Sequence, residues 1–202
     1  APVRASRTFL GPHAFPPEEY AAYGIVAFPA LATAETRPRH EFICQAYLAT
    51  LPRSKDLGVP SEQQMATVWP VSSEEMAKAL DDAAHWEQVT CKVAVNNYHL
   101  LSALRALRDA EVAGADTSGR GPYLLAWSPA SDKGNPDALV LRADLSGVTT
   151  EQQAMQILSD WRRDIEQDPS LWKDGWDMED LAAEIRLWAD KHGPEILALF
   201  GI

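Results

Sequence analysis

The chain has 202 residues, the length of one large domain or two small ones, and it is acidic, with 29 Asp and Glu against 18 Lys and Arg and a formal net charge of −11. Such a surface repels phosphate backbones and anionic lipids, which argues against nucleic acid and membrane surfaces as partners. No apolar run reaches the roughly 18–20 residues of a transmembrane helix, so no membrane span is expected. The chain begins at Ala1 rather than Met, which fits either a trimmed chain or an exported protein whose signal peptide has been removed.

The first half of the chain contains two predicted strands, each followed by a helix. Residues 1–23 are rich in proline and show no periodicity, which predicts an extended arm. The apolar run 24–29 is bounded by Gly and Pro and predicts a buried strand, after which helical spacing of apolar residues predicts a helix over 36–51. A second strand is expected over 65–71, and a helix with a serine N-cap over 72–81.

The middle of the chain fits two patterns. Apolar residues alternate from 89 to 95, as in a strand, but they also continue a helical spacing toward position 112 without Gly or Pro. We therefore expect one helix over 90–112. Strands are predicted over 123–127 and 138–144, and because the polar connector between them is short, they should form an antiparallel hairpin.

The C-terminal part, residues 149–202, is predicted to be helical. Thr149 or Thr150 caps a helix that ends near residue 166, another helix is expected over 178–192, and a short last helix ends at Phe200. The element order β-α-β-α-α-β-β-α-α-α predicts a single α/β domain, with a mixed α+β fold as the alternative. Its core is a small mixed four-stranded sheet whose first two strands are parallel, with helices on its faces and the C-terminal part packed on it.

This order resembles the thioredoxin arrangement of β-α-β, a helix, a β-hairpin and a helix. Pro122, just before the third predicted strand, lies where that family places a cis-proline. The family's C-x-x-C motif is missing, because the residues after the first predicted strand read Ala-Leu-Ala-Thr-Ala over 30–34. The resemblance therefore implies the topology, but without a vicinal dithiol it implies no thiol–disulfide exchange.

The two cysteines, Cys44 and Cys91, allow two interpretations. They form one disulfide if the chain folds in an oxidising compartment, or they pack as two buried thiols. None of the five histidines stands in a zinc-binding spacing such as H-x-x-x-H. No metal site is therefore predicted, and no motif indicates a cofactor.

Two groups of residues are candidates for binding a ligand. Asp116, Arg120 and Asp144 lie at the ends of the third and fourth predicted strands, where mixed α/β domains usually place ligands. Trp172 and Trp176 flank a glycine among acidic residues. Their ring faces would hold a cation or a sugar-like ligand, or the rings pack at the start of the helix that follows.

No recognisable catalytic motif stands in the sequence. We therefore expect a non-enzymatic binding or interaction domain whose partner is a small molecule or another protein, and the seven Trp residues and the acidic surface fit this expectation. One alternative is a hydrolase-like enzyme whose site lies at the ends of strands three and four. The other is a thiol switch that uses the two cysteines.

Overall fold

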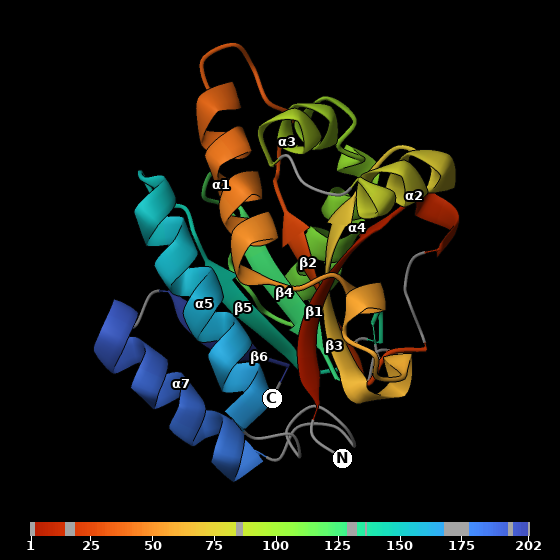
Figure 1. Cartoon of the computed structure of the whole chain (residues 1–202). Coiled ribbons are helices and arrows are strands. Elements are labelled where there is room, and N and C mark those ends of the chain that lie inside the picture. Colours follow the sequence, from red (N-terminus) through yellow and green to blue (C-terminus); the bar gives the residue numbers. More distant parts are fainter. Residues whose placement is uncertain are drawn as a thin grey trace.

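The computed structural model describes residues 3–14, 19–83, 87–128, 133–135, 137–167, 178–193 and 196–201. These residues contain one mixed sheet of six strands in the order β1-β3-β2-β4-β5-β6 (Figure 1). In chain order the strands are β1 (Arg4–Leu10), β2 (Ala22–Ala27), β3 (Gln64–Pro70), β4 (Tyr123–Trp127), β5 (Val140–Asp144) and β6 (Leu197–Phe200). Strands β1 and β2 both run parallel to β3, whereas β4 is antiparallel to β2, β5 to β4 and β6 to β5.

Helices cover both faces of this sheet. They are α1 (Arg37–Thr50), α2 (Glu74–Asp82), α3 (Glu87–Asn96), α4 (Leu100–Val112), α5 (Glu151–Gln167) and α7 (Met178–His192). Helices α1 and α5 lie side by side in front of the strands in Figure 1, and α7 lies beside α5 next to β6. Helix α4 contacts β2, β3 and β4 and lies behind them in the same view. Among the described residues, no helix is long and apolar enough to span a membrane.

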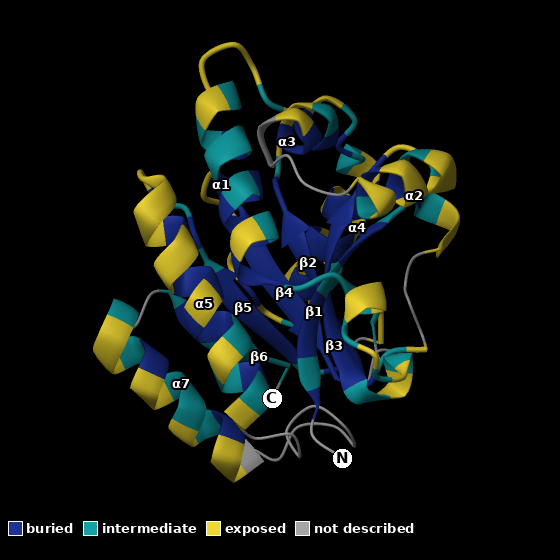
Figure 2. Ribbon diagram, in the orientation of Figure 1, coloured by how far each residue is buried: buried dark blue, intermediate teal, exposed yellow. Residues whose placement is uncertain are grey.

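The core lies between the central strands and these helices. Every residue of β2, β3 and β4 is buried, as Figure 2 shows. Strands covered on both faces need apolar side chains in both directions, which is why these segments appear in the sequence as continuous apolar runs. The fully buried Trp69, Trp127 and Trp161 are the largest side chains of this interior.

The structure confirms the mixed α/β class and the central features of the predicted topology. The four predicted strands belong to one sheet, the first two are parallel neighbours of each other, and the last two form an antiparallel pair. The peptide bond between Gly121 and Pro122 is cis, as the resemblance implied. Ser73 caps α2 by accepting a hydrogen bond from Met76 N at 3.1 Å.

Two strands were not predicted, so the four-stranded sheet is wrong in number. Residues 4–10 of the supposed arm form the edge strand β1, which carries Arg4, Ser6, Arg7 and Thr8 and lacks an apolar alternation. Residues 197–200, expected in a last helix, form β6. A run of four apolar residues fits either type of element, and pairing with β5 selects the strand. The C-terminal part is therefore not wholly helical.

The single helix expected over 90–112 is divided into α3 and α4. Tyr98 lies between them and forms an isolated bridge with Val71. Its buried hydroxyl donates to Val26 O at 2.6 Å and accepts from Phe28 N at 2.9 Å, which satisfies the end of β2. His99 then caps α4. These long-range contacts break the helix where the local sequence contains no breaker.

Cys44 of α1 and Cys91 of α3 form a disulfide, with their Cα atoms 5.6 Å apart. This geometry agrees with the first of the two interpretations left open by the sequence, one disulfide rather than two separate thiols. Both cysteines are fully buried, and the bond joins α3 directly to α1, against which it packs.

Candidate functional site

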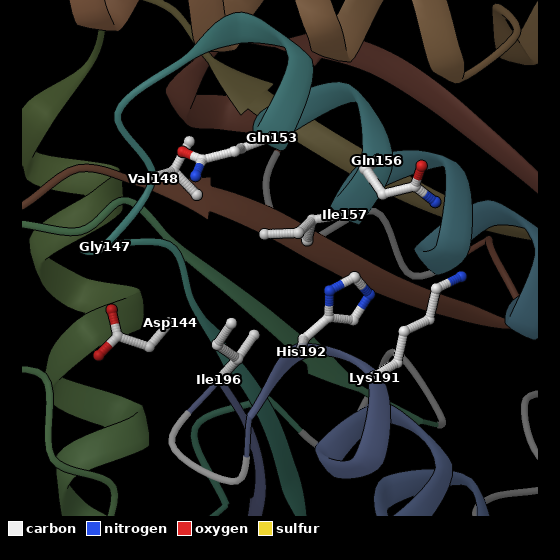
Figure 3. Close-up of a pocket in the computed structure, with 9 residues that line it drawn as sticks. All are labelled: Asp144, Gly147, Val148, Gln153, Gln156, Ile157, Lys191, His192 and Ile196. Atoms are coloured by element: carbon white, nitrogen blue, oxygen red, sulfur yellow. The ribbon is translucent and has the colours of Figure 1, made fainter.

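A cavity of about 420 Å³ lies at the carboxyl end of β5, between the first turns of α5 and the last turn of α7 (Figure 3). We call it the α5–α7 cavity. Its walls combine apolar side chains with amide, imidazole, ammonium and carboxylate groups. The lining residues are Asp144, Gly147, Val148, Gln153, Gln156, Ile157, Lys191, His192 and Ile196.

The turn that follows β5 forms one wall, and two arginines hold it in place. The Asp144 carboxylate accepts a hydrogen bond from Ser146 N at 2.8 Å, which closes the turn locally. Arg39 of α1 donates to Val148 O at 2.9 Å, and Arg120 donates to Ser146 O at 2.6 Å. Burial and the nearby Arg120 lower the pKa of Arg39 to about 10, so it is still charged at neutral pH. This wall is therefore fixed by contacts from two distant segments.

The first turn of α5 forms a second wall through a reciprocal capping box. Thr150 Oγ1 accepts from Gln153 N at 3.2 Å, and Gln153 Oε1 accepts from the backbone N–H of Thr149 at 2.8 Å and of Thr150 at 3.3 Å. The side-chain amide nitrogen of Gln153 has no hydrogen-bond partner among the described residues. A donor is thus left available at the cavity wall.

A buried carboxylate organises the polar end of the cavity. Asp160 of α5 is only 1% exposed. It accepts from His192 Nε2 at 2.7 Å, Lys191 Nζ at 2.8 Å and Gln156 Nε2 at 3.2 Å, and Arg163 lies 2.9 Å away. Burial alone would raise the pKa of Asp160, but the hydrogen bonds from Lys191, Gln156 and His192 outweigh it and hold that pKa below its usual value. Asp160 is therefore ionised at neutral pH.

The ionised Asp160 determines which nitrogen of His192 carries the proton. An ionised carboxylate only accepts hydrogen bonds, so Nε2–H of the imidazole must be the donor. In the neutral ring, Nδ1 then carries a lone pair, and it has no partner among the described residues. Figure 3 shows the ring projecting into the group of lining side chains, with Ile157 and Ile196 near it. The imidazole offers the cavity a hydrogen-bond acceptor, or a base.

The candidate residues predicted from the sequence lie in different places relative to the α5–α7 cavity. Asp144 lines the cavity, and Arg120 lies outside it but holds its wall. Asp116 is not among the lining residues: its carboxylate accepts from Ser118 N at 3.0 Å, within its own loop. Trp172 and Trp176 lie outside the described residues.

Sequence reasoning missed the pair formed by Asp160 and His192. One signal was present in α5, because Asp160 falls on the helix face that carries Ile157, Leu158 and Trp161. A carboxylate on an apolar face needs a buried partner. The sequence does not identify that partner, since His192 lies on another helix and reaches Asp160 only through the packing of α7 beside α5.

Among the described residues, no group of three or more His, Cys, Asp or Glu is placed to hold a metal ion. The chain matches no protein-family model, no curated protein and no solved structure. The chemistry of the α5–α7 cavity is therefore the basis for assigning a function.

Proposed function

We propose that this protein is a small-molecule-binding domain that holds its ligand in the α5–α7 cavity. The observation that carries the proposal is Nδ1 of His192, which has no partner in the part of the chain that the structure describes and which the bond from Nε2 to the buried Asp160 orients toward a partly apolar cavity. Ligand pockets typically combine apolar walls with a few oriented polar groups, and they enclose about 300–1,000 Å³. The α5–α7 cavity has both properties.

The polar groups indicate the ligand's chemical class. Where Nδ1 of His192 carries a lone pair it accepts a hydrogen bond, so the ligand should present a hydroxyl or an N–H group to it. The amide nitrogen of Gln153 donates to an acceptor on the same ligand. Val148, Ile157 and Ile196 face its apolar part. These groups favour a compact molecule with one apolar side and a hydroxyl or amine on the other.

Filling the cavity tests the proposal. Gly147 lines it, has no left-handed backbone conformation, and a Cβ built there meets nothing within 4 Å. Gly147→Phe should therefore fold and add the bulk of a ring at the wall of the cavity. The control is Leu187→Phe, which changes an exposed position on α7. A fragment library that pairs hydroxyl or amine compounds with their methylated analogues is screened by ligand-observed NMR.

We expect hydroxyl or amine fragments to bind the wild type and Leu187→Phe, and Gly147→Phe to lose them. The imidazole nitrogen resonances should show Nδ1 of His192 responding to the fragment while Nε2 keeps its proton. Fragments that bind Gly147→Phe as well as the wild type would show that this cavity is not the binding site.

A hydrolase is the second candidate, and the Asp160–His192 pair favours it. Nδ1 would take a proton from a water molecule as that water attacks the substrate, and Asp160 would stabilise the resulting imidazolium. The described lining residues include no Ser, Thr or Cys, and in this mechanism water is the nucleophile. Turnover of ester, peptide or glycoside substrates that disappears in His192→Ala would select this function over binding alone.

A further inference from the structure

Helix α4 packs against the sheet mostly with small side chains, together with Leu107, which is 4% exposed. Three alanines, Ala103, Ala106 and Ala110, face inward and are completely buried. The larger Leu101 and Leu104 are 50% and 41% exposed, as is Val112 at 60%. An amphipathic helix normally buries its larger apolar side chains, so this helix carries a second apolar face that the described residues leave uncovered.

A groove of about 710 Å³ runs along this face. We call it the α4 groove. Its apolar lining residues are Pro29, Leu101, Leu104, Leu107 and Val112. Positions 101 to 112 span about 16 Å along a helix at 1.5 Å per residue. That length matches about three turns of a bound helix or about five residues of an extended peptide.

Positive charge borders the apolar lining. Arg105 and Arg108 line the groove, and neither makes an ion pair with any residue that the structure describes. Glu111, the acidic residue of the lining, already accepts a hydrogen bond from Thr117 Oγ1 at 2.7 Å. Two guanidinium groups against one carboxylate give the described lining of the groove a net positive charge, on a chain whose formal net charge is −11.

We propose that the α4 groove binds a peptide segment of another protein, in which apolar side chains alternate with Asp or Glu. The apolar side chains cover Leu101 and Leu104, and the carboxylates pair with Arg105 and Arg108. A second copy of this chain fits less well, because a two-fold contact through α4 would place the same two arginines of both copies against each other.

Peptide selection tests this inference with the intact protein. Short random peptides displayed on phage are selected on the wild type after depletion on the double variant Leu101→Ser/Leu104→Ser. The changed residues are exposed, so circular dichroism should show an unchanged fold. Enriched peptides should contain Leu, Ile or Phe together with Asp or Glu. A synthetic peptide of this type should bind the double variant about tenfold more weakly by fluorescence anisotropy.

Two further variants test the role of the arginines and control for the loss of an exposed leucine elsewhere on the surface. Arg105→Glu/Arg108→Glu should reduce binding of the acidic peptide about tenfold, whereas Leu187→Ser, at an exposed leucine of α7, should leave it unchanged. Failure to enrich any peptide, enrichment of basic peptides, or an equal loss in Leu187→Ser would overturn the proposal. Sedimentation showing a dimer that Leu101→Ser/Leu104→Ser abolishes would also overturn it, because the occupant would then be a second copy.

Discussion

Replacing the buried carboxylate of Asp160 with an amide should destabilise the domain. Asp160→Asn removes the negative charge that holds His192, which is itself only 10% exposed, so this hydrogen bond is well shielded from water. Hydrogen bonds to charged groups contribute about 1.5–3 kcal/mol. Lys191 and Arg163 are nearly half exposed, and solvent screening makes their share small. We therefore expect a loss of about 2–3 kcal/mol, and a melting temperature lower by about 4–12 °C.

The matched control is Asp164→Asn, the same change one helical turn further along α5. Burial raises the pKa of Asp164 even though Arg163 lies beside it, so its ionised form is disfavoured in the folded state. Removing that charge at neutral pH should therefore leave the free energy of unfolding unchanged or raise it. Urea unfolding followed by tryptophan fluorescence measures both variants. Equal losses in the two variants would refute the account of Asp160 as the organising charge.

The pH dependence gives the same reasoning a second test. The pKa of folded Asp160 lies below that of an unfolded carboxyl, about 3.9. The contribution of ionised Asp160 to the free energy of unfolding is therefore complete above the unfolded pKa. It is lost as the pH falls from the unfolded pKa toward the folded pKa. The difference in unfolding free energy between wild type and Asp160→Asn should be constant near neutral pH and shrink in acid. A difference that grows as the pH falls would contradict the expected lowering of the Asp160 pKa in the folded state.

Two further predictions concern stability. Reducing the bond between Cys44 and Cys91, which are 47 positions apart, should lower the free energy of unfolding by about 4 kcal/mol. Urea unfolding in the presence and in the absence of reductant measures this difference. If the pair is instead a switch, reduction should change ligand binding with little loss of stability. Burial raises the pKa of Asp81 to about 6. The stability that protonated Asp81 contributes to the fold is therefore present below about pH 4 and is lost as the pH rises through about 6. The free energy of unfolding should therefore decline between about pH 4 and about pH 7, and Asp81→Asn should make this decline smaller by about 1–2 kcal/mol. An equally large decline in Asp81→Asn would show that Asp81 does not cause it.

The central part of the fold was predictable because its physical cause is local. Strands β2 to β5 are covered on at least one face, so their sequences are apolar and bounded by Gly, Pro or polar loops. The edge strand β1 could not be recognised in this way. Ser6 and Thr8 are buried polar residues, and their strand conformation depends on pairing with β3, which is far away in the sequence.

The candidate site was predictable only in part, for the same reason. The strand-end rule led to Asp144, which lines the α5–α7 cavity. The Asp160–His192 pair depends on how α7 packs beside α5, and the two residues are 32 positions apart. The break at Tyr98 likewise arises from a hydroxyl that bonds to the end of β2, a contact that no helical spacing reveals.

The position of β6 has a consequence for the order in which the domain is assembled during synthesis. Strand β6 pairs with β5 at one edge of the sheet, and His192 and Ile196 come just before it in the chain. A nascent chain can therefore acquire β1 to β5 and most of the interior before any imidazole reaches Asp160. A molecule in which α7 and β6 are detached would keep the central sheet but lose Lys191, His192 and Ile196 from the cavity, so ligand occupancy would report whether this segment has docked.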